Sequence, residues 1–131
     1  MMRILLAVGL AAIAGCADGA DRPARWSYIH AAIVAPSCAT AGCHSKITSI
    51  AGLDLSSREG AYTILTARVC GEPEPAQGAP HNFIVPYAPE ASRLYHQLLG
   101  QNTDRMPPDT ALPAVEIALI AQWIEEGATC E

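Results

Sequence analysis

The sequence has few aromatic and few basic side chains. Only seven of its 131 residues are Phe, Trp or Tyr, so a domain built from this chain has a thin hydrophobic core. Eight basic residues stand against thirteen acidic ones, and this formal charge of −5 argues against nucleic acid as a partner. Asp109, Glu116 and the serines lack a paired base or nucleophile at a catalytic spacing, so the sequence does not predict an enzyme.

An export signal opens the chain. Residues 1–15 (MMRILLAVGLAAIAG) join Arg3 to an apolar run and then to small residues, which is typical of a secretory signal peptide. Residues 13–16 (IAGC) resemble the lipobox of bacterial lipoproteins, in which the cysteine becomes the lipidated first residue. Ordinary cleavage near Ala14, which leaves Cys16 as a thiol, is the alternative. We expect a periplasm-facing lipoprotein of the cell envelope. Because Ala17 follows Cys16 in place of the usual inner-membrane retention residue, the outer membrane is slightly favoured over the inner one.

The rest of the sequence predicts a short tether followed by one helical domain. Residues 16–24 are small and polar and suit a flexible lipidated tether, and residues 25–131 are long enough for one domain. Apolar residues recur at helical spacing in four segments, one of which opens on a capping-box pattern from Ser56 to Glu59. Between the second and third segments lies a loop rich in proline and glycine. The prediction is an all-α domain with long irregular loops and helices over 25–35, about 56–69, 89–99 and 113–127.

The segment Cys38-Ala-Thr-Ala-Gly-Cys43-His44 carries the chemistry. Two thiols followed at once by an imidazole are the pattern of a covalent haem c site, in which both cysteines bond to the vinyl groups and the histidine ligates iron. The usual two intervening residues are widened to four, all small, and we expect Gly42 to tighten the turn before Cys43. Disulfides made by Cys38 and Cys43 are the alternative in an exported protein, and zinc has too few ligands here.

A second iron ligand is expected downstream. Met106 is the only methionine left once the signal peptide is removed, and it stands in the proline-bounded loop 105–108. A rigid loop can hold its thioether sulfur over iron, so we expect Met106 as the distal ligand, while simple packing of this side chain is the alternative. His30 and His96 fall within predicted helices and are expected to pack or face solvent. His81, in the proline-rich loop, is the stronger rival.

Two cysteines then remain. Cys70 and Cys130 are expected to form a disulfide that ties the loop after the second helix to the chain end, with free thiols as the alternative. Closing a loop of that length stabilises a fold by about 4 kcal/mol on the chain-entropy account.

Together these features resemble the single-haem class I cytochrome c family, and within it exported bacterial lipoproteins. The order of the pieces carries the resemblance: the helix before Cys38, the stretch 51–55 (AGLDL), residues 85–95, the Met106-Pro-Pro loop and the closing 122–128 (QWIEEGA). The resemblance implies about four short helices around one covalent haem c, with His44 proximal and Met106 distal. It also implies that the first and last helices cross, with Ile120 and Trp123 facing Ile29 and Ile33.

The function implied is one-electron transfer between redox protein partners, from a lipid anchor in the membrane. Two other functions stay open on the sequence: a cytochrome subunit that receives electrons from a separate dehydrogenase, and a haem-free, disulfide-stapled lipoprotein that acts as a binding module. Arg93 and Arg105 are candidates, by charge alone, for the partners of the haem propionates.

Overall fold

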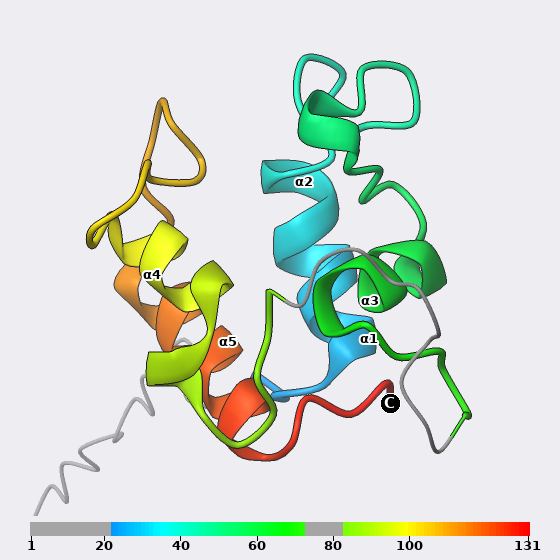
Figure 1. The fold of residues 1–131 in the computed structure, drawn as a ribbon, viewed down its shortest axis with the longest axis vertical. Coiled ribbons are helices and arrows are strands. Elements are labelled where there is room, and N and C mark those ends of the chain that lie inside the picture. Colours follow the sequence, from blue (N-terminus) through cyan, green and yellow to red (C-terminus); the bar gives the residue numbers. More distant parts are fainter. Residues whose placement is uncertain (1–21, 73–82) are drawn as a thin grey trace, which may run out of the picture.

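The computed structural model describes residues 22–72 and 83–131, which form short helices joined by long loops, with no strand among them (Figure 1). The predicted all-α class is therefore confirmed for these residues. Residues 1–21, with the expected signal peptide and Cys16, and residues 73–82, with His81, lie outside the described ranges. Within those ranges no helix is both long and apolar enough to cross a membrane.

The first helix is longer than predicted. Its backbone stays helical through α1 (Trp26–Ile29), the π-helical segment η2 (His30–Val34) and α2 (Ala35–Ser37). We expected Pro36 to end the helix at residue 35, and this boundary is wrong by two residues. Pro36 lies in the short α2 turn that directly follows the π-helical segment, and the helix continues for only one residue beyond it. As a result, the helix ends directly on Cys38.

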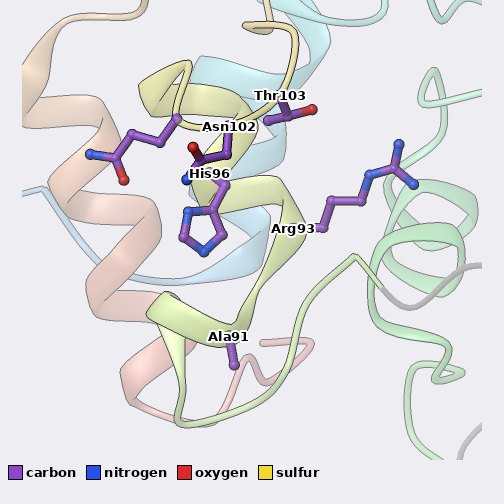
Figure 2. A pocket seen from close by; sticks show the side chains of 6 residues that line it. Ala91, Arg93, His96, Asn102 and Thr103 are labelled. Atoms are coloured by element: carbon purple, nitrogen blue, oxygen red, sulfur yellow. The ribbon is translucent and has the colours of Figure 1, made fainter.

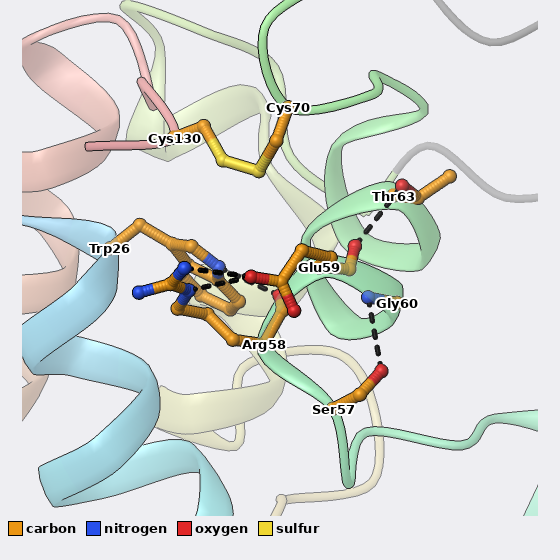
Figure 3. A network of polar contacts seen from close by, with 8 residues as sticks. All are labelled: Trp26, Ser57, Arg58, Glu59, Gly60, Thr63, Cys70 and Cys130. Carbon is orange, nitrogen blue, oxygen red and sulfur yellow. Dashed lines mark hydrogen bonds and ion pairs between the residues drawn. A yellow bond between two sulfur atoms is a disulfide. The ribbon is translucent and has the colours of Figure 1, made fainter.

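The second helix, α3 (Arg58–Thr66), is capped by a different serine from the one predicted. The hydroxyl of Ser57 accepts a hydrogen bond from the backbone N–H of Gly60 at 3.2 Å (Figure 3). The predicted capping box of Ser56 and Glu59 is wrong, because the Ser56 hydroxyl instead donates to Asp54 at 2.5 Å. Ser56 therefore belongs to the preceding loop, and α3 begins two residues later and ends three residues earlier than the predicted range of about 56–69.

The predicted helix over 89–99 is interrupted at Ser92. It divides into a 3-10 turn, η4 (Pro89–Ala91), and a regular helix, α4 (Arg93–Leu99), which ends on Gly100 at φ 65° as predicted. Ser92 is fully buried, and its hydroxyl bonds to the N–H of Val85 and to the carbonyl of Ala88, each at 2.9 Å. These side-chain bonds to backbone compete with helical bonding and explain the break. The last helix, α5 (Ala114–Glu125), lies inside the predicted range.

The core gathers most of the few large aromatic side chains between the first and last helices. The indole rings of Trp26 and Trp123 stack with centroids 5.0 Å apart, and the ring of Tyr62 lies 5.9 Å from that of Trp26. Their polar atoms are satisfied by backbone carbonyls, for example the Trp26 N–H by Arg58 at 2.9 Å (Figure 3). Ile29 and Ile33 are buried in the same cluster. The first and last helices thus pack against each other.

A disulfide joins the segment after α3 to the end of the chain. Cys70 and Cys130 lie at disulfide distance, with Cα atoms 5.4 Å apart (Figure 3). This is the pair expected from the sequence. The link holds the C-terminal segment beside α3, where the Tyr62 hydroxyl donates to the carbonyl of Ala128 at 2.9 Å.

Candidate functional site

Residues that are far apart in the sequence line one apolar cleft. Two cavities, of about 370 Å³ and about 180 Å³, share Cys38, His44, Ile50 and Met106 among their walls, and we refer to them together as the cleft. The larger cavity falls within the volume range of sites for small ligands and cofactors. The helix-end and loop residues of the N-terminal half therefore meet the Met106 loop of the C-terminal half across a single space.

Aliphatic and aromatic side chains make most of the wall. Six of them come from four parts of the chain, namely the loop before α3, α3 itself, the segment before η4, and α4: Leu53, Leu55, Leu65, Phe83, Leu94 and Leu98. Polar side chains line only part of the larger cavity, where Arg93 and Gln97 of α4 stand near Thr103 and Asp104. A ligand in the cleft would thus meet a largely apolar surface with one polar margin.

The two thiols of the motif line this cleft and are not joined to each other. Cys38 and Cys43 are both free and half-buried, and both line the smaller cavity. Burial, together with the nearby Cys43 thiol, raises the pKa of Cys38 to about 11. At neutral pH the Cys38 side chain is therefore a neutral thiol.

The widened spacing between the cysteines is taken up by a compact turn. The N–H of Cys43 donates to the carbonyl of Thr40 at 2.9 Å, and the N–H of His44 donates to the carbonyl of Cys38 at 3.1 Å. These bonds bring His44 back to the end of α2 despite the four residues between the thiols. Gly42 is not among the residues with positive φ, and a Cβ added there would meet nothing within 4 Å. Gly42 thus lies within this turn without the left-handed φ that would favour glycine there.

The imidazole of His44 is oriented by a backbone carbonyl. Its Nδ1 lies 3.0 Å from the carbonyl oxygen of Ile50, in the short 3-10 segment η3 (Ile50–Gly52). Since a carbonyl only accepts, Nδ1 carries the proton and Nε2 keeps its lone pair. Ser49 and Ala51, on either side of Ile50, have left-handed φ values of 42° and 57°. Such angles are costly for side chains with a Cβ, and they mark a loop held in an unusual shape around His44.

Further backbone and side-chain bonds fix the same loop. The N–H of Ile50 donates to the carbonyl of Cys43 at 3.1 Å, and the N–H of Leu55 donates to the carbonyl of His44 at 2.8 Å. The N–H of Lys46 donates to the hydroxyl of Ser56 at 2.8 Å. The segment that presents His44 is thus tied to itself and to the entry of α3.

Met106 is held at the wall of the cleft by two sets of bonds. Its backbone N–H donates to the carbonyl of Gln97 in α4 at 2.9 Å. The guanidinium of Arg105 donates to the carbonyls of Pro107 and Pro108, at 3.4 Å and 3.1 Å, and so closes the loop over its own backbone. The half-buried Met106 side chain lines both cavities.

The rival histidines do not line the cleft where the structure describes them. The Nε2 of His30 donates to the carbonyl of Leu55 at 3.0 Å inside the core. The Nε2 of His96 donates to the carbonyl of Glu90 at 2.8 Å, and its ring lines a neighbouring cavity of about 420 Å³, which shares Arg93 and Thr103 with the cleft (Figure 2). His81 lies outside the described residues.

Sequence reasoning missed some groups that shape the site. The carbonyl of Ile50 is one, since a backbone atom leaves no trace in residue type. The leucines at 65, 94 and 98 are others, because their spacing predicts a helix face but not which space that face borders. Comparison with models of protein families, with curated proteins and with solved structures gave no match to this chain.

Proposed function

We propose that this protein is an exported, lipid-anchored electron carrier that holds one covalent haem c, with His44 and Met106 as axial ligands. The observation that carries the proposal is the meeting of Cys38, Cys43, His44 and Met106 at one apolar cleft. These residues come from segments more than sixty positions apart, and nothing in helix packing alone requires them to face the same space.

The donor set fits the group chemically. Two reduced thiols, one imidazole and one thioether are the side chains that a covalently attached, six-coordinate haem requires. The thiols of Cys38 and Cys43 would each add across a vinyl double bond, forming a carbon–sulfur bond while the thiol hydrogen goes to the neighbouring carbon. This addition needs reduced thiols and no oxidant, and both thiols are free.

The protein would tune the ligands through their surroundings. The hydrogen bond from Nδ1 of His44 to Ile50 fixes the tautomer and makes Nε2 a better donor. Met106 supplies a soft thioether, which raises a reduction potential relative to a second imidazole. The leucine-rich wall of the cleft would exclude water. Bound haem c would supply one-electron exchange between Fe(III) and Fe(II), and redox protein partners would reach it at the cleft.

The anchor belongs to the same proposal. Cys16 would carry the lipid, and residues 16–24 would link it to the domain on the periplasmic side of a membrane. An N-terminal peptide mass that includes acyl chains would support this part. A Cys16→Ser variant should then be found in the soluble periplasmic fraction with its haem intact.

The deciding experiment is the intact mass and reduced absorption spectrum of the protein expressed in a periplasm with a competent haem-maturation system. One covalent haem and a low-spin spectrum of His/Met type are expected. A Cys38→Ser, Cys43→Ser variant is the matched control and should carry no covalent haem. If the wild-type protein retains two unmodified thiols under these conditions, the proposal is wrong and a haem-free binding module takes its place.

A further inference from the structure

The cleft has one basic side chain on its wall, and it is Arg93. Seven basic residues lie in the described ranges, and only Arg93 among them lines either cavity of the cleft. It is the first residue of α4, directly after the fully buried Ser92, whose hydroxyl bonds to residues 85 and 88. The start of α4 is therefore fixed, and with it the point from which the Arg93 side chain extends.

Other arginines are already engaged elsewhere. Arg58 pairs with Glu59 at 2.7 Å, and Arg22 lies 3.7 Å from Glu116. Arg68 donates to the carbonyl of Gly127 at 3.1 Å, and Arg105 donates to the two prolines of its own loop. These four guanidinium groups already pair with acids or bond to backbone carbonyls, and none of the four arginines lines the cleft.

Arg93 has no acidic partner among residues 22–72 and 83–131. Its guanidinium carbon lies 5.3 Å from the centre of the Phe83 ring, so the cation rests against an apolar part of the wall. No ion pair or hydrogen bond joins its guanidinium to another described residue. A cation placed at the margin of an apolar cleft without an acid of its own favours a ligand with an anionic end.

A hydroxyl group stands on the same side. In Figure 2 the side chains of Arg93 and Thr103 extend toward the same side of α4, and both residues also line the neighbouring cavity together with His96. Thr103 lines the larger cavity of the cleft together with Arg93. Asp104 lies on that margin as well, and its negative charge would oppose an anionic ligand unless a cation offsets it.

We infer that Arg93, assisted by the Thr103 hydroxyl, binds a propionate carboxylate of the haem, an inference that rests on the proposed function. A guanidinium presents parallel N–H donors that match the two oxygens of a carboxylate. The same charge favours Fe(II) over Fe(III), because it offsets the negative propionate. Arg105, the other candidate by charge, is assigned instead to closing the Met106 loop.

The test compares the midpoint potential and covalent haem content of holoprotein variants. Arg93→Gln removes the charge, Arg93→Lys keeps a point charge without the fork, and Arg58→Gln is a charge-matched control away from the cleft. We expect full haem content in each. Arg93→Gln should lower the midpoint potential. At a fixed applied potential the Fe(II)/Fe(III) ratio should fall several-fold to tenfold, and a tenfold fall corresponds to a shift of about 59 mV for one electron. Arg58→Gln should leave the potential within a small fraction of that shift.

The pH dependence supplies a second measurement. Without Arg93 the propionate should bind a proton at higher pH, so the potential of Arg93→Gln should rise as pH falls toward the acidic range while that of the wild type stays flatter. The potential of Arg93→Lys, and its change with pH, should lie between those of the wild type and Arg93→Gln. If Arg93→Gln does not fold, Arg93→Lys takes its place in the potential and pH measurements. Asp104→Asn should move the potential in the opposite direction.

The failure of this inference can be told apart from failure of the proposed function. A wild-type protein without covalent haem would overturn both. Covalent haem in every variant, with equal potentials and equal pH profiles for Arg93→Gln and Arg58→Gln, would overturn the assignment of Arg93 and leave the electron carrier standing.

Discussion

The indole rings of Trp26 and Trp123 stack at 5.0 Å and 24°, and this contact joins the first helix to the last. Both rings are essentially without solvent exposure, and each indole N–H is bonded to a backbone carbonyl. The cleft depends on this contact, because the first helix ends on Cys38 while the Met106 loop runs into α5.

The stacked pair should therefore dominate the stability of the domain. Trp123→Ala should lower the free energy of unfolding by about 3–5 kcal/mol through the cavity and the lost contacts. Val115→Ala, on an exposed position of the same helix, should change it by less than about 0.5 kcal/mol. Chemical denaturation followed by circular dichroism measures both, and similar losses for the two variants would contradict the packing described.

Met106 is expected to act on the spectrum rather than on stability. Met106→Ala should lower the midpoint potential and give a changed or high-spin spectrum, because the soft sixth ligand is lost. Haem content should stay unchanged, since the thiols that attach it are separate. An unaltered spectrum would rule out Met106, and His81→Ala would then be the next variant to measure.

Substitution by alanine should have little effect at Gly42 and should destabilise the fold at Gly100. Gly42→Ala should leave stability within about 0.5 kcal/mol and haem content intact, since the added Cβ meets open space. Gly100→Ala should cost about 1 kcal/mol or more, because φ is +65° and the Cβ would lie 3.3 Å from that of Arg105. It should also broaden or shift the haem spectrum through the Met106 loop. Thermal melts and spectra of the two variants provide the comparison.

The disulfide should stabilise the fold without taking part in haem attachment. Replacing Cys70 and Cys130 together by serine opens a link across 60 positions and should cost about 2–4 kcal/mol. The double variant should still carry covalent haem when folded. If the folded double variant carries no haem in its intact mass, then Cys70 and Cys130, and not Cys38 and Cys43, attach the cofactor.

Before haem is attached, Cys38 should give stability a dependence on alkaline pH. Its pKa is raised from 9.0 to about 11, so the folded state binds the thiol proton more tightly than the unfolded chain does. The contribution of the Cys38 thiol to the free energy of unfolding is therefore complete below pH 9 and is lost as pH rises toward 11. Denaturation of the haem-free protein between pH 8 and about 11 should show this loss, and Cys38→Ser should remove it.

Local patterns in the sequence were sufficient for the helices themselves. Apolar spacing in the first and last helices, and Gly100 at the end of α4, depend on neighbours within one or two turns. The predicted helix boundaries were wrong where a serine side chain had two possible hydrogen-bond partners. Ser56 had the spacing of a cap but bonds to Asp54, and Ser92 lay inside a helical pattern but bonds to the backbone of residues 85 and 88.

The sequence by itself determined the chemical inventory: two cysteines beside an imidazole, one thioether downstream and a second cysteine pair, behind a segment that predicts an export signal. Only the tertiary structure decided that Cys38, Cys43, His44 and Met106 share one apolar cleft. That meeting depends on long-range packing around the two tryptophans, which residue spacing does not encode. The structure alone also gave the Ile50 carbonyl behind His44 and set Arg93 apart from Arg105, because charge in a sequence does not reveal which side chains are already engaged.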